Sequence, residues 1–243
     1  SDTRRLWSEG LGSSAEAAAT ATALGLRLPT ANPFIAEDLS LKDLAAGVPK
    51  IPVALPVTMP VSCIYHKQDD RFKQPKAQIA FRIYTSFPSS SVENEVCAQL
   101  WCLAVQEGLL EYAYDAEVAG VRYSLGLDDG VIGLVLSGFN DKLPVLLDAV
   151  TEKMKSMVEV PETLFSIVAE SFENDIKNLA FRSAPYAQCS MRFNELTKKG
   201  GGFPAYKKCE AFKSLKREDL NDMANKLFDK SHVEVLSLGN LLP

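Results

Sequence analysis

The sequence predicts an α+β fold, in which an antiparallel or mixed β-sheet carries helices packed on one face. Residues 109–142 read as the end of a helix, two strands joined by a tight turn, and the start of a second helix. Strand patterns precede this hairpin, several amphipathic helices follow it, and a last strand closes the chain. Strand pairs that are separated by helices in this way favour a sheet with one helical layer.

Length and charge limit the classes of protein to which the chain can belong. Its 243 residues fit one large domain, or one domain with part of another. A net charge of -5 disfavours nucleic acid and anionic membranes as main partners, because both require a positive surface. No apolar run reaches the roughly 20 residues that span a bilayer. We therefore expect no nucleic acid and no membrane among its partners, and a cytoplasmic location unless a targeting segment precedes the chain.

The first sixty residues carry few signals of regular structure. An alanine-rich run at 13–25 predicts a short helix that ends at Gly25. Two prolines then favour extended backbone between residues 26 and 41. Four more prolines lie between residues 49 and 60, which excludes an interior strand or a helix there. We place the main domain boundary or linker between about residues 42 and 60.

Strand and helix periodicity becomes regular after this linker. Residues 61–67 predict a first strand and residues 77–86 a second. Alternation in the second strand predicts one apolar face that carries Ile79, Phe81 and Ile83. A long helix is predicted from about Val92, and its apolar side chains form more than one stripe. We expect that helix to contact neighbours on two sides.

The first strand of the hairpin has one apolar face and one polar face. The apolar face carries Val121, Tyr123, Leu125 and Leu127, and the polar face carries Arg122, Ser124, Gly126 and Asp128. Asp129-Gly130 predicts a type I′ turn, because that turn needs positive φ at both central positions. The returning strand, residues 131–138, is apolar on both faces and is expected to be central in the sheet.

The C-terminal part predicts four helices and a closing strand. Helices at 143–157 and 164–179 have apolar residues at helical spacing and are expected to cover the sheet. A third helix is predicted at 186–196, and residues 233–238 form the closing strand. The last helix has four residues at core spacing, which are Leu220, Met223, Leu227 and Phe228.

Local motifs for catalysis are absent from the sequence. The two histidines, His66 and His232, lack the spacing that places two imidazoles on one helix face around zinc. The sequence has no phosphate-binding loop, no dinucleotide-binding glycine pattern and no nucleophile elbow. The five cysteines show no Cys-x-x-Cys spacing, and we interpret them as reduced core thiols.

Carboxylates in the helix before the hairpin admit two interpretations. Glu111 and Asp115, with Glu117 nearby, have the composition of an acid/base pair. Carboxylates at i and i+4 are nevertheless typical of a solvated helix face, which is the interpretation we favour. Tyr112 and Tyr114 point to different sides of this helix and are interpreted as packing residues.

Turn residues flank the hairpin on both sides. Gly120 marks the end of the preceding helix, where positive φ is commonly needed. Asn140 or Asp141 is predicted to cap the following helix by accepting hydrogen bonds from its free N–H groups.

Several stretches of the sequence resemble one protein family. The sequence EYAYDAEVAGVRYSL at 111–125, followed by GLVLSGFNDK at 133–142, closely resembles the corresponding region of the pitrilysin/insulinase family of zinc metallopeptidases. Three further stretches resemble the same family in the same order, at 28–41, 65–81 and 232–240. The motif positions of the hairpin region are Glu111, Tyr112, Tyr114, Glu117, Gly120, Gly138, Asn140 and Asp141.

This resemblance implies a LuxS/MPP-like fold, the metallopeptidase α/β roll, within four homologous domains that form two halves around a chamber. It also implies that residues 1–44 are the tail of a preceding domain plus a linker, and that residues 45–243 are the third domain. The family holds zinc through an inverted motif in its first domain. None of its zinc ligands, nor its catalytic glutamate, has a matching position here. The resemblance therefore assigns no catalytic residue and no metal ligand to this chain, and places the zinc cofactor outside it.

A third domain of this family is expected to act as chamber wall and scaffold in a zinc metalloendopeptidase that degrades peptides. It is expected to be inactive alone, with the other domains of the same polypeptide and peptide substrates as its partners. The polar strand face with Arg122, Ser124 and Asp128 is our candidate for lining the chamber. The alternative is a fragment of a catalytically inactive relative that acts as a binding or scaffold subunit. An inverted zinc motif upstream in the reading frame would separate the two.

Overall fold

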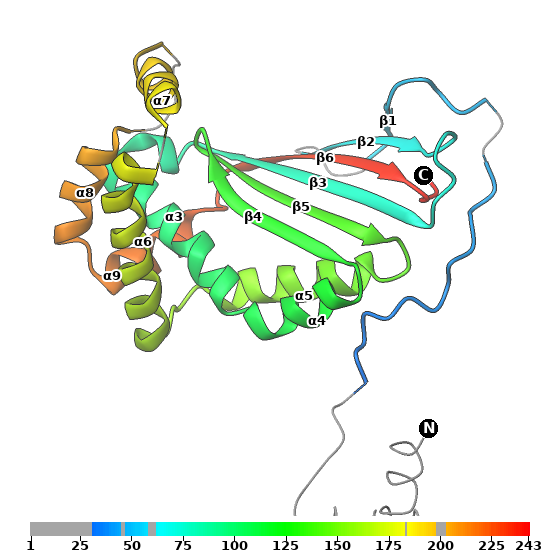
Figure 1. The fold of residues 1–243 in the computed structure, drawn as a ribbon, viewed down its shortest axis with the longest axis horizontal. Coiled ribbons are helices and arrows are strands. Elements are labelled where there is room, and N and C mark those ends of the chain that lie inside the picture. The colour runs from blue at the N-terminus through cyan, green and yellow to red at the C-terminus, as the bar shows by residue number, and fades with distance from the viewer. Residues whose placement is uncertain (1–30, 45–46, 58–61, 183, 198–202) are drawn as a thin grey trace, which may run out of the picture. The chain divides into compact units, whose positions relative to one another are not determined.

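The computed structural model describes residues 31–44, 47–57, 62–182, 184–197 and 203–243. The helix predicted at 13–25 lies outside these residues. Residues Pro33–Pro243 form one compact unit, and the fold described below is the fold of this unit (Figure 1).

The described residues form a sheet of six strands in the order β1-β2-β6-β3-β5-β4. β2 and β6 run parallel, whereas the other neighbouring strands run antiparallel, which confirms the predicted α+β class with a mixed sheet. The C-terminal strand β6 lies in the middle of the sheet, and β5 is an interior strand beside the edge strand β4 (Figure 1). The strands are β1 Val53–Leu55, β2 Ser62–Gln68, β3 Lys76–Thr85, β4 Arg122–Asp128, β5 Val131–Phe139 and β6 Ser231–Gly239.

A short edge strand, β1, lies inside the segment in which the prolines predicted only a linker. It pairs antiparallel with β2 over three residues, from Val53 opposite His66 to Leu55 opposite Ile64. Pro52 and Pro56 flank it directly. A proline lacks a backbone donor, so the strand is confined to these three residues and to the edge of the sheet.

One face of the sheet carries the core. The register places Ile79 opposite Leu136 and Phe81 opposite Leu134, and Leu134 also faces Leu125 of β4. Leu125, Leu134 and Leu136 are buried, and so is Val121 just before β4. The alternation predicted for the hairpin is therefore confirmed. Its turn is confirmed as well, because Asp129 and Gly130 have φ of 49° and 77°.

Seven α-helices occur in the described part of the chain, and three of them make the main helix contacts with the sheet. α3, α4 and α5 lie on one side of it, against β4 and β5 (Figure 1). The side chain of Ser91 begins α3 by accepting a hydrogen bond from the Asn94 N–H at 3.1 Å. The helices are α3 Val92–Glu107, α4 Leu110–Val118, α5 Leu143–Ser156, α6 Glu162–Arg182, α7 Pro185–Thr197, α8 Ala205–Ser214 and α9 Arg217–Lys226.

The helices form two layers, and the prediction that α6 covers the sheet is wrong. α6 packs against α3 and α8, while α5 packs on β5 as predicted (Figure 1). The reason is the broad apolar surface of α3, which contacts β4 on one side and α6, α8 and α9 on the other. The two-sided contact predicted for α3 is confirmed. α8, which buries only Ala211 among its ten residues, was not predicted.

The described helices leave most of the opposite face of the sheet uncovered, and we call it the open face (Figure 1). No helix among the described residues has the length and the apolar content to cross a bilayer.

Candidate functional site

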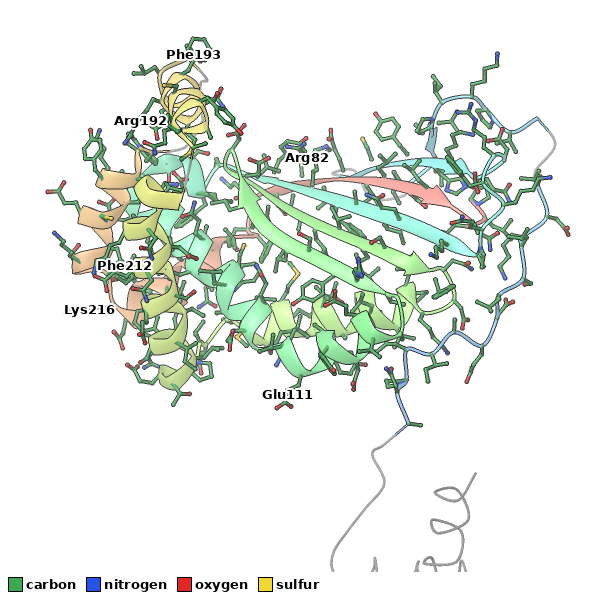
Figure 2. All side chains as sticks on the ribbon, viewed as in Figure 1. Arg82, Glu111, Arg192, Phe193, Phe212 and Lys216 are labelled. Atoms are coloured by element: carbon green, nitrogen blue, oxygen red, sulfur yellow. The ribbon has the colours of Figure 1, made fainter. Side chains whose placement is uncertain are left out.

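The open face presents the polar residues that the sequence assigns to one side of β4. Arg122, Ser124 and Asp128 are all exposed there, opposite the buried Leu125 side. The register continues their rows across the sheet, so that Arg122 lies in line with Ser137 of β5. Figure 2 shows Arg82 of β3 on this side of the sheet and Glu111 of α4 on the other side.

A cavity of about 660 Å³ lies at one end of the open face. Its floor is a row of side chains from five neighbouring strands, which are Arg122, Ser137, Gln78, Leu238 and Lys67. Its wall comes from the loop between β2 and β3, residues 69–75, through Asp69, Asp70, Arg71, Phe72 and Gln74. We call this cavity the row pocket.

The carboxylates of the row pocket are already bound within the protein. Asp70 accepts a hydrogen bond from Lys67 Nζ at 2.9 Å, which lowers the pKa of its carboxyl. Asp69 accepts from the backbone N–H groups of Arg71 and Phe72, each at 3.0 Å. Burial acts to raise the pKa of Asp69, but these and further backbone hydrogen bonds lower it overall. Both carboxylates therefore hold the loop in place instead of facing the cavity with free charge.

Apart from Lys67, which binds Asp70, the cations of the row pocket are less engaged. Arg122 Nε lies 3.5 Å from Glu117 Oε1, and both side chains are about two-thirds exposed, so this ion pair is weak. Lys76 Nζ lies 5.4 Å from the centre of the Phe139 ring. The pocket thus presents net positive charge in a chain of net charge -5.

Asp128, the third candidate residue, lies away from the row pocket. It stands at the hairpin tip and lines a different cavity of about 430 Å³, together with residues of α3, α6 and α7. There Glu95 and Lys208 form an ion pair that is mostly shielded from solvent. The three candidates thus share one face of β4, but Arg122 lines the row pocket, Asp128 lines the second cavity, and Ser124 lies in neither lining.

A second polar cluster lies farther along the open face. Tyr84 donates a hydrogen bond to Glu234 Oε2 at 2.9 Å, which raises the pKa of the tyrosine. His232 Nε2 lies 3.8 Å from the other oxygen of Glu234, and the Arg82 guanidinium lies 5.9 Å from the Tyr84 ring centre. Sequence reasoning missed this cluster, because the β3–β6 register that creates it cannot be inferred from local patterns.

Among the motif residues of α4, Tyr112 packs against another side chain, whereas the others are exposed to solvent. Tyr112 packs edge-on against the fully buried Phe34, with ring centres 4.9 Å apart. Tyr114 is 68% exposed in the described part of the chain, so the prediction that it packs within this domain is wrong. Glu111, Asp115 and Glu117 are exposed, as a solvated helix face predicts.

Two motif glycines meet where β5 passes the end of α4. Gly120 has φ of +78°, as predicted for a residue at a helix end, and Gly138 has φ of +138°. A Cβ added to Gly138 would collide with the carbonyl oxygen of Gly120 and lie 2.7 Å from the Val121 Cα. A glycine at 138 is therefore needed for this close contact between the two backbones, and Gly120 accommodates the positive φ beside it.

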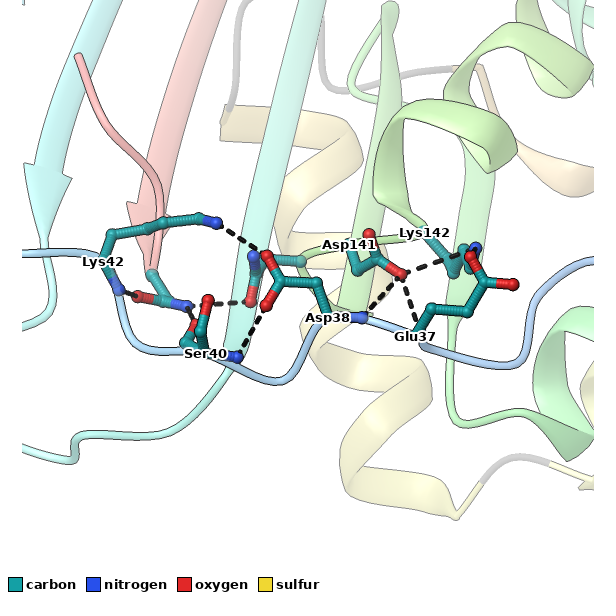
Figure 3. A network of polar contacts seen from close by, with 8 residues as sticks. Glu37, Asp38, Ser40, Lys42, Asp141 and Lys142 are labelled. Carbon is teal, nitrogen blue, oxygen red and sulfur yellow. Dashed lines mark hydrogen bonds and ion pairs between the residues drawn. The ribbon is translucent and has the colours of Figure 1, made fainter.

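Asn140 and Asp141 bind distant segments, and the prediction that either residue caps α5 is wrong. The N-cap residue of α5 is Lys142, and no side chain accepts hydrogen bonds from that helix end. Asp141 Oδ2 accepts from the backbone N–H groups of Glu37 and Asp38, at 3.0 and 3.4 Å (Figure 3). Asn140 is buried and accepts from the side chain of Asn240 at 3.0 Å.

These contacts fasten residues 33–44, which we call the strap, to the domain. Asn240 accepts from Lys42 N–H at 2.7 Å and donates to the Ser40 carbonyl at 2.9 Å. Lys142 Nζ reaches Glu37 at 3.3 Å and Asp141 at 3.4 Å (Figure 3). The motif residues at the end of β5 thus form a clasp for the strap.

Asp141→Asn is expected to loosen the strap at neutral pH. Hydrogen bonds from Glu37 and Asp38 lower the pKa of the Asp141 carboxyl, so its stabilising effect is present above pH 3.8 and is lost as the pH falls through the lowered pKa. Amide exchange measured by NMR should become faster at Glu37 and Asp38 in the variant. Asp148→Asn, an exposed position on α5, should leave both amides unchanged. Equal protection in both variants would rule out the clasp.

The described residues do not bring together a metal site. His66 is buried on the helix-covered side of the sheet, whereas His232 lies on the open face. No group of three or more histidine, cysteine, aspartate or glutamate side chains in the described ranges is arranged to hold a metal ion. Burial raises the pKa of the Cys97 and Cys102 thiols to about 12, which fits core thiols. Cys189 is exposed, so the interpretation of all cysteines as core residues is wrong for it.

Comparison with known proteins connects this architecture to one family. A family model described as the middle or third domain of peptidase M16 matches residues 7–211. The chain belongs to the M16 peptidase family. Human insulin-degrading enzyme is 30% identical over 217 residues, and nardilysin from Homo sapiens is 29% identical over 163 residues. The resemblance to the pitrilysin/insulinase group found in the sequence is thereby confirmed.

Solved structures support the M16 fold. The crystal structure of pitrilysin matches with a TM-score of 0.76 at 19% identity, covering 93% of this chain and 24% of that chain. A conserved protein from Enterococcus faecalis V583 matches more distantly, with a TM-score of 0.57 at 14% identity, covering 78% of this chain and 49% of that chain.

The chain spans about a fifth of the length of its curated M16 relatives. It covers 22% of insulin-degrading enzyme-like 1, peroxisomal, from Arabidopsis thaliana, to which it is 32% identical over 89% of its own length. It covers 21% of human insulin-degrading enzyme over 88% of its own length, and 14% of human nardilysin over 67%. The matched part is a small fraction of a much longer protein in each case.

Proposed function

We propose that this chain is the non-catalytic middle domain of a zinc endopeptidase, and that the open face of its sheet forms part of the wall of a peptide-binding chamber. The observation that carries the proposal is the match to the middle or third domain of peptidase M16, together with a sheet whose described helices lie on one face. Residues 1–44 are assigned to a preceding domain and its linker, and residues 45–243 to the middle domain. The partners are the other domains of the same polypeptide and peptide substrates.

The described residues do not fit a zinc site. His66 and His232 project from opposite faces of the sheet, so they cannot converge on one ion. The catalytic zinc of the proposed enzyme is therefore assigned to another domain. The middle domain contributes shape and fixed polar groups, which position an unfolded peptide and exclude large folded proteins.

Ser124→Trp in the full polypeptide tests whether the open face lines the chamber. The indole would project from the centre of β4 into the space assigned to the peptide. We expect kcat/KM for peptide cleavage to fall by at least about threefold, equivalent to ~0.7 kcal/mol. The matched control is Ser156→Trp, at an exposed serine that ends α5 on the helical side.

The two variants should have equal thermal stability and should differ only in turnover. Unchanged kcat/KM for Ser124→Trp would contradict the assignment of the open face. A full reading frame without the inverted zinc motif would instead support a catalytically inactive relative that acts as a scaffold.

A further inference from the structure

We propose that the row pocket is an anchoring subsite for an acidic segment of the peptide substrate. This inference rests on the proposed function, because it assumes that the open face meets the peptide. It assigns the contact to Arg71, Lys76 and Arg122, with Phe72 as an apolar neighbour at the rim.

The dimensions of the row pocket suit an extended peptide. Its floor crosses five strands from Arg122 to Lys67, and neighbouring strands lie about 4.8 Å apart, so the row is roughly 19 Å long. An extended chain rises about 3.3 Å per residue, which matches about six residues laid across the strands. Ser137 and Gln78 place neutral polar groups along this path, where they can bond to peptide N–H and C=O groups.

The charge balance of the row pocket favours carboxylates. It holds four cationic side chains and two carboxylates, and both carboxylates already bind Lys67 or the loop backbone. Within the described ranges, neither Arg71 nor Lys76 forms an ion pair of 4.0 Å or less with a carboxylate, although the charge of Arg71 helps to lower the pKa of Asp70. Arg122 can exchange its weak contact with Glu117 for a bidentate contact with an incoming carboxylate.

The rim adds an apolar contact that a small inorganic anion would not use. Phe72 is 77% exposed, although it belongs to a loop that Asp69 holds through two backbone hydrogen bonds. Leu238 provides a second apolar surface in the floor. A cavity of about 660 Å³ also far exceeds the size of a single phosphate ion. The combination fits a peptide with acidic side chains beside an apolar one.

Direct binding to the 243-residue chain tests the subsite. The probe is a fluorescein-labelled eight-residue peptide with two glutamates and one phenylalanine in a glycine-serine background, measured by fluorescence anisotropy at low salt. The chain should bind this peptide at least about ten times more tightly than the same peptide with lysines in place of glutamates. Arg71→Glu with Lys76→Glu should reverse that preference. Added salt should weaken the binding, because the contact is between exposed charges.

A charge-matched control distinguishes binding at the row pocket from an effect of the net charge of the chain. Lys155→Glu with Lys213→Glu makes the same charge change at exposed positions of α5 and α8, and should bind the acidic peptide as the unaltered chain does. Circular dichroism and the thermal midpoint should be alike in both double variants. Three results would overturn the subsite: no binding by the unaltered chain, equal binding by the two double variants, or displacement by inorganic phosphate at the concentrations at which unlabelled peptide competes.

The proposal of the subsite and the proposal of the chamber wall can be refuted independently. If Ser124→Trp leaves turnover unchanged while Arg71 and Lys76 still control peptide binding, the orientation of the open face is wrong and the subsite stands. If Ser124→Trp lowers turnover while the pocket variant binds peptide normally, the chamber wall stands and the subsite is wrong.

Discussion

Gly138→Ala is expected to lower the free energy of unfolding by about 3 kcal/mol or more. Gly138 has φ of +138°, and forcing an alanine into such a conformation costs about 1–3 kcal/mol. The added Cβ would also collide with the Gly120 carbonyl and lie 2.7 Å from the Val121 Cα. Backbone atoms cannot move aside as a flexible side chain does, so overpacking adds roughly another 1–3 kcal/mol.

Urea unfolding followed by circular dichroism measures this effect. Gly133→Ala is the matched control, because Gly133 lies on the same strand and a Cβ there meets nothing within 4 Å. The control should change stability by about 0.5 kcal/mol or less, or raise it by up to about 1 kcal/mol through backbone entropy. Similar losses in both variants would show that the close contact between Gly138 and Gly120 is not the cause.

Trp101→Ala is expected to cost about 3–5 kcal/mol of stability, the range typical of large aromatic truncations in a core. Trp101 is 1% exposed on α3, the helix that joins the sheet to the outer helical layer. Its ring packs edge-on against Phe228 with centres 5.4 Å apart. Its Nε1 donates to the Met157 carbonyl at 3.0 Å, which ties the end of α5 to α3. The substitution removes packing and leaves that carbonyl without its partner.

One further variant separates the packing of Trp101 from its hydrogen bond, and a second is a control at an exposed ring. Trp101→Phe keeps an aromatic ring but loses the hydrogen bond, so we expect an intermediate loss of about 1–3 kcal/mol. Phe193→Ala removes a 66% exposed ring from α7 and should stay within about 0.5 kcal/mol of the unaltered chain. Equal losses for Trp101→Ala and Phe193→Ala in urea unfolding would contradict the central position of Trp101.

Patterns of neighbouring residues in the sequence correctly predicted the strand β4 and the turn that follows it. The period of two in β4 placed Leu125 inside and Ser124 outside, and the Asp129-Gly130 turn has the positive φ values that its sequence requires. β1 escaped prediction because it has only three residues between prolines. α8 escaped prediction because it buries only Ala211 among its ten residues.

The roles of Asn140 and Asp141, and the composition of the row pocket, depend on contacts between residues that are distant in the sequence. Asn140 and Asp141 have the side chains of helix caps, but Asn240 and the strap bind them instead across about a hundred residues of sequence. No rule of capping contains that information. The row pocket is a similar case, since Arg122 was found from β4 alone. Gln78 joins it through the pairing of β3 with β5, and Lys67 joins it through the insertion of β6 between β2 and β3.

The most direct test of the account is peptide cleavage by the purified 243-residue chain in the presence of zinc. A quenched fluorescent peptide should show no turnover above the protein-free blank, with or without added zinc, because the chain is assigned as a non-catalytic domain. Turnover that a chelator abolishes and zinc restores would contradict that assignment.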